Sequence, residues 1–332
     1  MKLSIGIVGL PNVGKSTLFN ALTKKSVPAE NYPFCTIDPS IGIVPVPDER
    51  LNALSRLSKS ARTIPAVIEF VDIAGLVKGA SEGEGLGNKF LSNIREVDAI
   101  LEMVRVFEDK DIIHVHGEVN PISDIEVINY ELVLADTETI TKRLQNLSKD
   151  VKAQKKEAIF EESVLQKALE SLKQGKLANT LSLDEKESAV VKSMHLLTAK
   201  PILYALNTSE AASENKDVAA KIPGPYVAVD PVFEKGFDEL IKKAYETLGL
   251  ITYFTTGEDE TRAWTIERGW TAPLAGTAIH TDFKDKFIRA EVVHCDDLLS
   301  AGSYPAAREK GLVRTEGKEY VVKDGDVIEF RI

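Results

Sequence analysis

The segment GLPNVGKST, residues 9–17, carries the pattern G-x-x-x-x-G-K-S/T with every required position filled. The apolar residues 3–8 predict a buried strand before it, and residues 16–22 predict the opening of a helix after it. Glycines let such a loop curl until successive N–H groups face a phosphate, and the helix N-terminus adds partial positive charge. The pattern assigns Lys15 to the β- and γ-phosphates and the Ser16 hydroxyl to Mg²⁺. We therefore predict a nucleoside triphosphate site whose contacting residues are Asn12, Val13, Gly14, Lys15, Ser16 and Thr17.

Length and composition narrow the class of protein. A chain of 332 residues predicts two or three domains, and the absence of a long uncharged apolar run argues against a membrane span. The N-terminus runs directly into the first predicted strand, which leaves no room for a signal peptide. Cys35 and Cys295 lie far apart and suggest no disulfide, as expected in a reducing compartment. A net charge of −10 gives no global attraction to DNA or to an anionic membrane. We expect a cytoplasmic protein.

Two further segments carry signals of a nucleotide-dependent switch. Thr36 lies about twenty residues beyond Lys15 in a segment rich in turn formers. It is either a switch threonine that closes on Mg²⁺ and the γ-phosphate or an ordinary loop residue. The apolar residues 66–71 predict a strand that ends in Asp72, followed three positions later by Gly75. This arrangement suits a carboxylate on the Mg²⁺ side and a backbone amide that senses the γ-phosphate.

The segment after Gly75 is unusual for a hydrolase of this type. Leu76 stands where Ras-like GTPases carry the glutamine that orients the attacking water, and a leucine cannot orient water. If the protein hydrolyses its nucleotide, another group must take that role. The glycine-rich residues 78–88 then predict a mobile switch, because their own side chains cannot hold one conformation.

Histidines follow the third predicted strand, residues 99–107. His114 and His116 lie in a loop at the carboxyl end of this strand, where open α/β sheets place their ligands. The spacing alone leaves open whether they serve the site or are solvated loop residues.

A predicted helical segment, residues 132–199, interrupts the sheet pattern. Its apolar residues recur in steps typical of paired helices, at Val133, Ile140, Leu144, Leu147 and Val151 in one arm and Val164, Ala168 and Leu172 in the other. Residues 182–185 resemble a capping box in which Ser182 opens another helix. The sequence between residues 142 and 156 contains six basic residues and one acid, which indicates either a solvated helix face or an RNA contact.

The sheet pattern resumes at residues 201–206 and ends in Asn207-Thr208-Ser209-Glu210. GTPases carry N-K-x-D at this point, where the aspartate binds guanine. Glutamate is longer by one methylene, which displaces the acceptor and makes adenine admissible. Beyond residue 251, short strands separated by turns predict a small mixed domain.

These motifs, in this order, resemble the YchF/Obg-like ATPase family, a branch of the Obg-related translation-factor GTPases within the TRAFAC-class P-loop NTPases. The similarity extends from residue 2 to residue 332 and rests on GLPNVGKST, NYPFCTIDP, DIAGLVKGAS, NTSE, RAWTI and IHTDF. It implies an α/β fold with a Ras-like P-loop NTPase domain at residues 1–131 and 200–250. A helical coiled-coil hairpin at residues 132–199 is inserted into it, and a C-terminal β-grasp (TGS) domain follows at residues 251–332.

The resemblance also implies roles for individual residues. It implies ATP rather than GTP as the preferred nucleotide, through Asn207 and Glu210, and the ribosome as a partner. The family's substitute for the missing glutamine falls on His114, and Thr36 becomes the Mg²⁺-side switch residue. The implied catalytic set is His114, Lys15 and Gly75, and the implied metal set is Ser16, Thr36 and, through water, Asp72. Asn12 resembles the asparagine by which some related NTPases hold K⁺ beside the phosphates.

One departure from the family concerns the segment after Asp230. The family carries a longer segment between Asp230 and Pro231, including a loop that helps to hold the base. Either this segment is naturally absent, or the sequence omits residues at this join. The abrupt Asp230-Pro231 junction favours the second explanation.

The sequence therefore predicts a Mg²⁺-dependent ATP-hydrolysing switch associated with the ribosome. Two other functions remain open: a GTP-preferring translation factor, and a ribosome- or RNA-binding adaptor whose nucleotide is structural. A metabolic kinase is disfavoured, because the switch motif at Asp72 is present and no acceptor-site motif follows.

Overall fold

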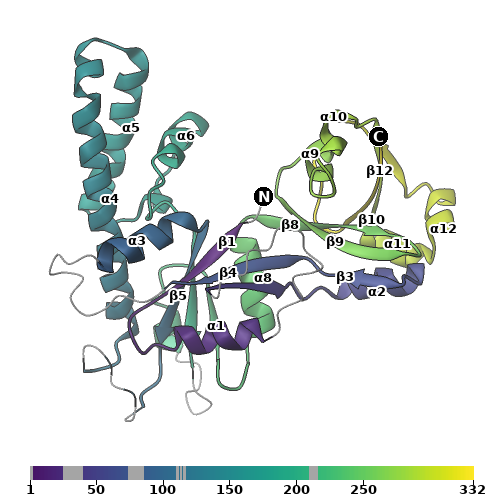
Figure 1. The fold of residues 1–332 in the computed structure, drawn as a ribbon, viewed down its shortest axis with the longest axis horizontal. Coiled ribbons are helices and arrows are strands. Elements are labelled where there is room, and N and C mark those ends of the chain that lie inside the picture. The colour runs from purple at the N-terminus through teal and green to yellow at the C-terminus, as the bar shows by residue number, and fades with distance from the viewer. Residues whose placement is uncertain are drawn as a thin grey trace.

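The computed structural model describes residues 3–24, 40–73, 86–109, 112, 114, 117–208 and 216–332, with backbone only at 86–89 and 216–217 (Figure 1). Several predicted features lie outside these ranges: Thr36, Gly75, Leu76, Glu210, His116 and most of the glycine-rich segment. Across the described ranges, no helix is both long and apolar enough to cross a membrane.

A six-stranded sheet forms the first half of the molecule, in the order β2-β4-β1-β5-β6-β7. Its strands are β1 (Ser4–Val8), β2 (Ile41–Pro45), β4 (Val67–Asp72), β5 (Ala99–Arg105), β6 (Ile202–Asn207) and β7 (Tyr226–Val229). All neighbours are parallel except β2, which runs antiparallel to β4. Every residue of β1, β5 and β6 is buried, as expected for parallel strands covered on both faces. The predicted strands before the phosphate loop, Asp72, the histidines and Asn207 are therefore confirmed.

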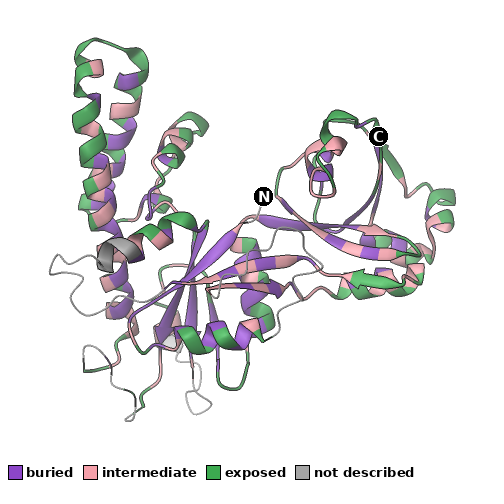
Figure 2. Ribbon diagram, viewed as in Figure 1, coloured by how far each residue is buried: buried purple, intermediate pink, exposed green. Residues whose placement is uncertain are grey.

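Helices on this sheet leave one edge available for a ligand. The helices of this part of the molecule are α1 (Lys15–Thr23), α3 (Leu86–Glu96), α7 (Lys216–Ala219) and α8 (Phe237–Thr247). A longer helix, α4 (Pro121–Lys152), also packs on β5. Helix α1 packs on β1, β2 and β4, whereas α8 packs on β6 and β7, and the strands between them are buried (Figure 2). Because parallel strands end at a common edge, the loops after β1, β5 and β6 meet there.

The helical segment projects from the sheet as two long antiparallel helices (Figure 1). It comprises α4 (Pro121–Lys152), α5 (Lys156–Lys173), the short 3₁₀ turn η3 (Ala178–Thr180) and α6 (Glu185–Ser193). The predicted seam is buried or half-buried between the helices at Val133, Ile140, Leu144, Leu147, Val151, Val164, Ala168 and Leu172. The predicted start of the insertion, residue 132, lies inside α4, which is continuous from the sheet to the tip.

The cap of α6 differs from the predicted one. Asp184, not Ser182, caps the helix: its carboxylate accepts the N–H of Glu187, whose carboxylate accepts the N–H of Asp184. The capping box is thus two residues further along the chain than predicted. The carbonyl of Ser182 instead accepts a hydrogen bond from Lys167, which places this residue before the helix.

A second sheet forms the C-terminal half, in the order β11-β10-β12-β8-β9-β3. Its strands are β3 (Arg62–Ile64), β8 (Leu250–Thr256), β9 (Glu260–Glu267), β10 (Arg289–His294), β11 (Arg314–Glu316) and β12 (Asp326–Arg331). Four short helices accompany it: α9 (Ala272–Gly276), α10 (Asp282–Asp285), α11 (Cys295–Ala301) and α12 (Tyr304–Glu309). This mixed architecture agrees with the predicted small domain, whereas its assignment to the TGS type stays a prediction.

The segment 49–64 belongs to the first half by sequence and to the second by packing. Helix α2 (Glu49–Ser58) packs on β9 and α11, and β3 pairs in parallel with β9. The predicted nucleotide-binding domain at residues 1–131 thus contributes a helix and an edge strand to the other sheet.

Arg50 fastens this segment to the C-terminal half. Its guanidinium binds Asp48, at the N-cap of α2, and donates to Asp324 at 2.7 Å. It also lies 5.3 Å from the ring centre of Phe254. One side chain therefore joins the start of α2 to strand β8 and to the turn before β12.

We expect Arg50→Ala to lower the free energy of unfolding of the C-terminal half by about 1–2 kcal/mol, because charge-assisted hydrogen bonds at a partly exposed site are lost. Urea denaturation followed by tryptophan fluorescence measures this, since both tryptophans, Trp264 and Trp270, lie in this half. Arg56→Ala, on an exposed position of the same helix, is the control and should change stability by less than about 0.5 kcal/mol. Equal midpoints for the two variants would contradict the role given to Arg50.

Candidate nucleotide-binding site

The phosphate loop connects β1 to α1 through a backbone that few residues can adopt. Gly9 has a φ of 147° and Gly14 a φ of 101°, both in the region that favours glycine. A Cβ at Gly14 would lie 2.6 Å from the side-chain nitrogen of Asn207, and one at Gly9 would lie 2.5 Å from the carbonyl oxygen of Met103. The glycines of the motif are thus required both for conformation and for close packing on β5 and β6.

Lys15 is buried inside this loop. Its ammonium donates to the carbonyl oxygens of Gly9 at 3.0 Å and Leu10 at 2.7 Å. Burial lowers the pKa of Lys15 to about 8, and the carboxylate of Asp72 partly opposes this shift. Burial likewise raises the pKa of Asp72, while Lys15 lowers it. The structure therefore brings together the two predicted charges of the site, one from α1 and one from the end of β4.

Asn207 supports the loop from the neighbouring strand. It is buried at the end of β6, and its side-chain amide donates to the carbonyl oxygen of Val13 at 2.8 Å. The sequence indicated a contact of Asn207 with the base but gave no sign of this hydrogen bond. The amide fixes the carbonyl immediately before Gly14, so it shapes the phosphate loop directly.

The predicted metal ligands in the described ranges supply oxygen donors at one edge of the sheet. Ser16 is exposed in the first turn of α1, and Asp72 is half-buried beside Lys15. Hydroxyl and carboxylate oxygens are the donors that Mg²⁺ prefers, and one carboxylate with retained waters is its usual protein contact. The donor set thus fits Mg²⁺. No cluster of three or more His, Cys, Asp or Glu that could hold a metal occurs in the described part of the chain.

His114 is not a solvated loop residue. Its side chain is 4% exposed, and its Nε2 lies 2.9 Å from Oδ2 of Asp124, whose side chain is 5% exposed. Asp124 belongs to the first turn of α4. Asp124 was not predicted as a site residue. The sequence nevertheless shows this acid in the first turn of the expected helix, ten positions after His114.

Arg105 holds the loop that leads to His114. This residue ends β5 and is 1% exposed, and its guanidinium donates to three backbone carbonyls, those of Phe107, Asp109 and Ile112. It also lies over the ring of Phe107. A basic residue at the end of a buried strand was a signal for this role that the sequence analysis did not use.

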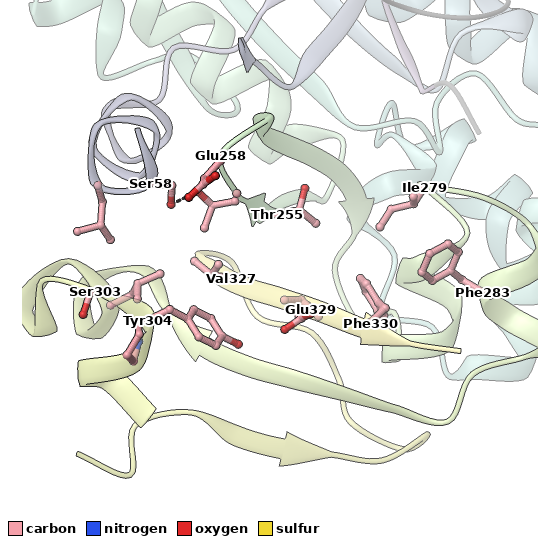
Figure 3. A pocket seen from close by; sticks show the side chains of 16 residues that line it. Ser58, Thr255, Glu258, Ile279, Phe283, Ser303, Tyr304, Val327, Glu329 and Phe330 are labelled. Carbon is pink, nitrogen blue, oxygen red and sulfur yellow. Dashed lines mark hydrogen bonds between the residues drawn. The ribbon is translucent and has the colours of Figure 1, made fainter. Parts of the chain in front are cut away.

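Two cavities of the described structure lie away from the phosphate loop. One cavity, of about 580 Å³, lies beside α2 and the C-terminal sheet, with Ser58 on one side and Tyr304 and Phe330 on the other (Figure 3). A second, of about 530 Å³, is lined by residues of both halves, including Arg50 and Lys242. Neither of these two is lined by the phosphate loop. The candidate site is therefore assigned from the geometry of the loop itself, at the carboxyl edge of the first sheet.

Comparisons with protein families match two separate ranges of the chain. Residues 4–135 match the family described as "50S ribosome-binding GTPase". Residues 250–332 match the family YchF-GTPase_C, described as "Protein of unknown function (DUF933)".

Individual relatives match along the whole chain. The chain is 51% identical to "Ribosome-binding ATPase YchF" of Bacillus subtilis (strain 168), covering 100% of this chain and 99% of the relative. It is 47% identical to the protein of the same name from Haemophilus influenzae, again over 100% and 99%. The solved structure described as "Structure of the Schizosaccharomyces pombe YchF GTPase" has a TM-score of 0.87 at 37% identity, covering 99% of this chain and 98% of that one.

The alignment with the Bacillus relative runs over 363 positions, more than the 332 residues of this chain. The relative therefore has residues that this chain lacks, and their location after Asp230 stays a prediction. The structure closes this join with a tight turn, in which the Asp230 carboxylate accepts the N–H groups of Val232 and Phe233.

We expect Asn207→Ala to weaken ATP and GTP binding by the same factor, about 5- to 30-fold, because losing its hydrogen bond loosens the loop under either nucleotide. Fluorescence titration of both nucleotides measures this. Thr208→Val is the matched control, because the Thr208 hydroxyl bonds the carbonyl of Val229 rather than the loop. A loss confined to one nucleotide would show that Asn207 acts through the base instead.

The lowered pKa of Lys15 predicts a pH dependence of nucleotide affinity. An ammonium with a pKa of about 8 is mostly charged at pH 7.5 and mostly neutral at pH 9, and phosphates bind the charged form. We therefore expect ADP affinity, measured calorimetrically in EDTA, to fall about tenfold over this range, in which the phosphates are already ionised. A Lys15→Arg variant, which cannot lose its proton, should show no such fall. Constant affinity in the unmodified protein would contradict the burial of Lys15.

Proposed function

The chain belongs to the YchF family, and on that premise we propose that it is a Mg²⁺-dependent ATPase that acts as a conformational switch on the ribosome. The observation that carries this proposal is the buried ammonium of Lys15 inside a loop whose glycines tolerate no Cβ. Such a loop binds phosphates through its backbone amides and this one positive charge.

Nucleotide binding changes the partners of Lys15 in this proposal. Its ammonium leaves the carbonyls of Gly9 and Leu10 and binds the β- and γ-phosphates. Ser16, Thr36 and Asp72 hold Mg²⁺, Asp72 through water. When bound, Mg²⁺ offsets the negative charge on the phosphate oxygens. The amide of Gly75 senses the γ-phosphate, so that the segments containing Thr36 and Gly75 respond to its presence.

His114 takes the place of the glutamine that Leu76 replaces. It orients the water that attacks the γ-phosphate, and its loop lies at the carboxyl end of β5, beside β1 and β6. Asn12, with its left-handed φ of 63°, is the residue proposed to hold K⁺ beside the phosphates.

The preference for ATP rests on Glu210, which lies outside the described ranges, and on the name of the relatives. The curated relatives are called ATPases, whereas the Schizosaccharomyces pombe protein is called a GTPase. The longer glutamate side chain displaces the acceptor that binds guanine, which favours ATP. A GTP-preferring enzyme is the first alternative.

The ribosome is proposed as partner from the names of the relatives, which also makes the cytoplasm the proposed location. The basic residues between positions 142 and 156 give this little additional support. Lys142, Arg143 and Lys155 form ion pairs with Glu138, Glu161 and Asp150, as expected of a solvated helix face. The second alternative is therefore an adaptor that binds ribosomes or RNA and keeps its nucleotide as a structural ligand.

One experiment separates these functions. ATP and GTP compete for one labelled nucleotide on the protein, and phosphate release is then followed with and without ribosomes in K⁺ or Na⁺ buffer. We expect ATP to bind at least tenfold more tightly, a difference of about 1.4 kcal/mol, and hydrolysis to exceed one phosphate per protein. Tighter GTP binding supports the GTPase, and release that stops at one phosphate supports the adaptor. Equal rates in K⁺ and Na⁺ remove the proposed K⁺ site.

A further inference from the structure

The buried carboxyl group of Asp124 contacts the imidazole of His114. Asp124 binds Nε2 of the imidazole through Oδ2, and both side chains are almost completely shielded from water. Its other oxygen, Oδ1, is buried without a hydrogen-bond partner in the described structure. Nearly all of the directed interaction of this carboxyl group is therefore with the histidine.

The start of α4 favours a charged carboxylate at Asp124. The helix begins with Asn120 as N-cap, which accepts the N–H of Ser123, and with Pro121 in its first turn. Asp124 lies in this same turn, where the unpaired N–H groups produce a partial positive charge. The helix thus stabilises a negative charge at the point where the imidazole docks.

A second buried acid, Glu102, lies close to this pair. Glu102 of β5 is 1% exposed, and burial together with the charge of Asp124 raises its pKa well above the usual value. Tyr204 of β6, which lies opposite Glu102 in the sheet, also has a raised pKa, caused by burial first and then by Glu102.

We propose that Asp124 is the positioning residue of His114: its carboxylate accepts the Nε2–H and fixes the imidazole in that tautomer and orientation. The inference rests on the proposed function, in which His114 orients the attacking water. A carboxylate that binds one imidazole nitrogen determines which nitrogen carries the proton and how the ring is turned. In the Nε2–H tautomer, Nδ1 carries no proton and can act as a hydrogen-bond acceptor.

Arg105 supports the same geometry from the other side of the loop. It binds three carbonyls of residues 107–112, whereas Asp124 binds the imidazole from α4. The loop that carries His114 is therefore tied to both β5 and α4. A group held at two points loses little additional freedom when the nucleotide binds, which is how positioning contributes to rate.

The test is Asp124→Asn in the full-length protein. The amide nearly keeps the size of the carboxyl group, but its NH₂ can donate to Nε2 and favour the wrong tautomer. We expect kcat for ATP to fall about 10- to 100-fold, with KM and ADP affinity changed less than twofold. An unchanged kcat, or a kcat that falls only in proportion to the loss of folded protein, would overturn the proposal.

A spectroscopic measurement tests the tautomer directly, starting with the unmodified protein. Nitrogen-15 NMR of labelled histidines reports the tautomer, and the signals of His114 are those that disappear in His114→Ala. We expect the Nε2–H form in the unmodified protein and an increased share of the Nδ1–H form in Asp124→Asn. A dominant Nδ1–H form in the unmodified protein would refute the role of Asp124.

Two comparisons separate the positioning role of Asp124 from a purely structural role and from the proposed function itself. Asp136→Asn is the matched control, because Asp136 is buried on the same helix but accepts hydrogen bonds only from Leu197 and Thr198 in the described structure. It should lower stability and leave kcat per folded molecule unchanged. If His114→Ala hydrolyses ATP at the normal rate, the proposed function itself fails. If His114→Ala is slow and Asp124→Asn is normal, only the positioning role fails.

Discussion

The structure depends on keeping the ammonium of Lys15 inside the loop that precedes it. A buried positive charge is tolerated only with close acceptors, and here the carbonyls of Gly9 and Leu10 provide them. This arrangement requires the left-handed turn at Gly14, where a Cβ would collide with the side chain of Asn207. The same Asn207 side chain fixes the carbonyl group that precedes Gly14. The phosphate loop is thus held by two strands of the sheet, and its charge is available to an anion that offers better acceptors than its own backbone.

The two sheets are joined at strands that border the predicted switch segments. Strand β2 follows the segment that contains Thr36, and β4 precedes the one that contains Gly75. Between β2 and β4 the chain leaves the first sheet to form α2 and β3 on the second, where Arg50 and the pairing of β3 with β9 fasten it. The backbone that connects the two predicted γ-phosphate contacts therefore runs through the C-terminal half.

The sequence predicted what local patterns encode and missed what distant packing decides. The phosphate loop, four strands of the first sheet and the helical seam followed from motif spacing and apolar periodicity. The pairing of β3 with β9 could not be predicted, since its three residues show no pattern and its partner lies about 200 positions away. The burial of Glu102 depends on how α4 packs on β5, and a single acid within an apolar run gives no sign of that. The cap of α6 was misplaced because serine and aspartate are both good N-caps two residues apart, and the side-chain geometry chose between them.

A crystal structure with Mg²⁺ and a non-hydrolysable ATP analogue tests the central claim most directly. The account predicts that the ammonium of Lys15 leaves the carbonyls of Gly9 and Leu10 for oxygens of the β- and γ-phosphates, with the triphosphate cradled by residues 12–17. It would be contradicted by a Lys15 side chain still bound to its own loop while the nucleotide lies elsewhere on the molecule.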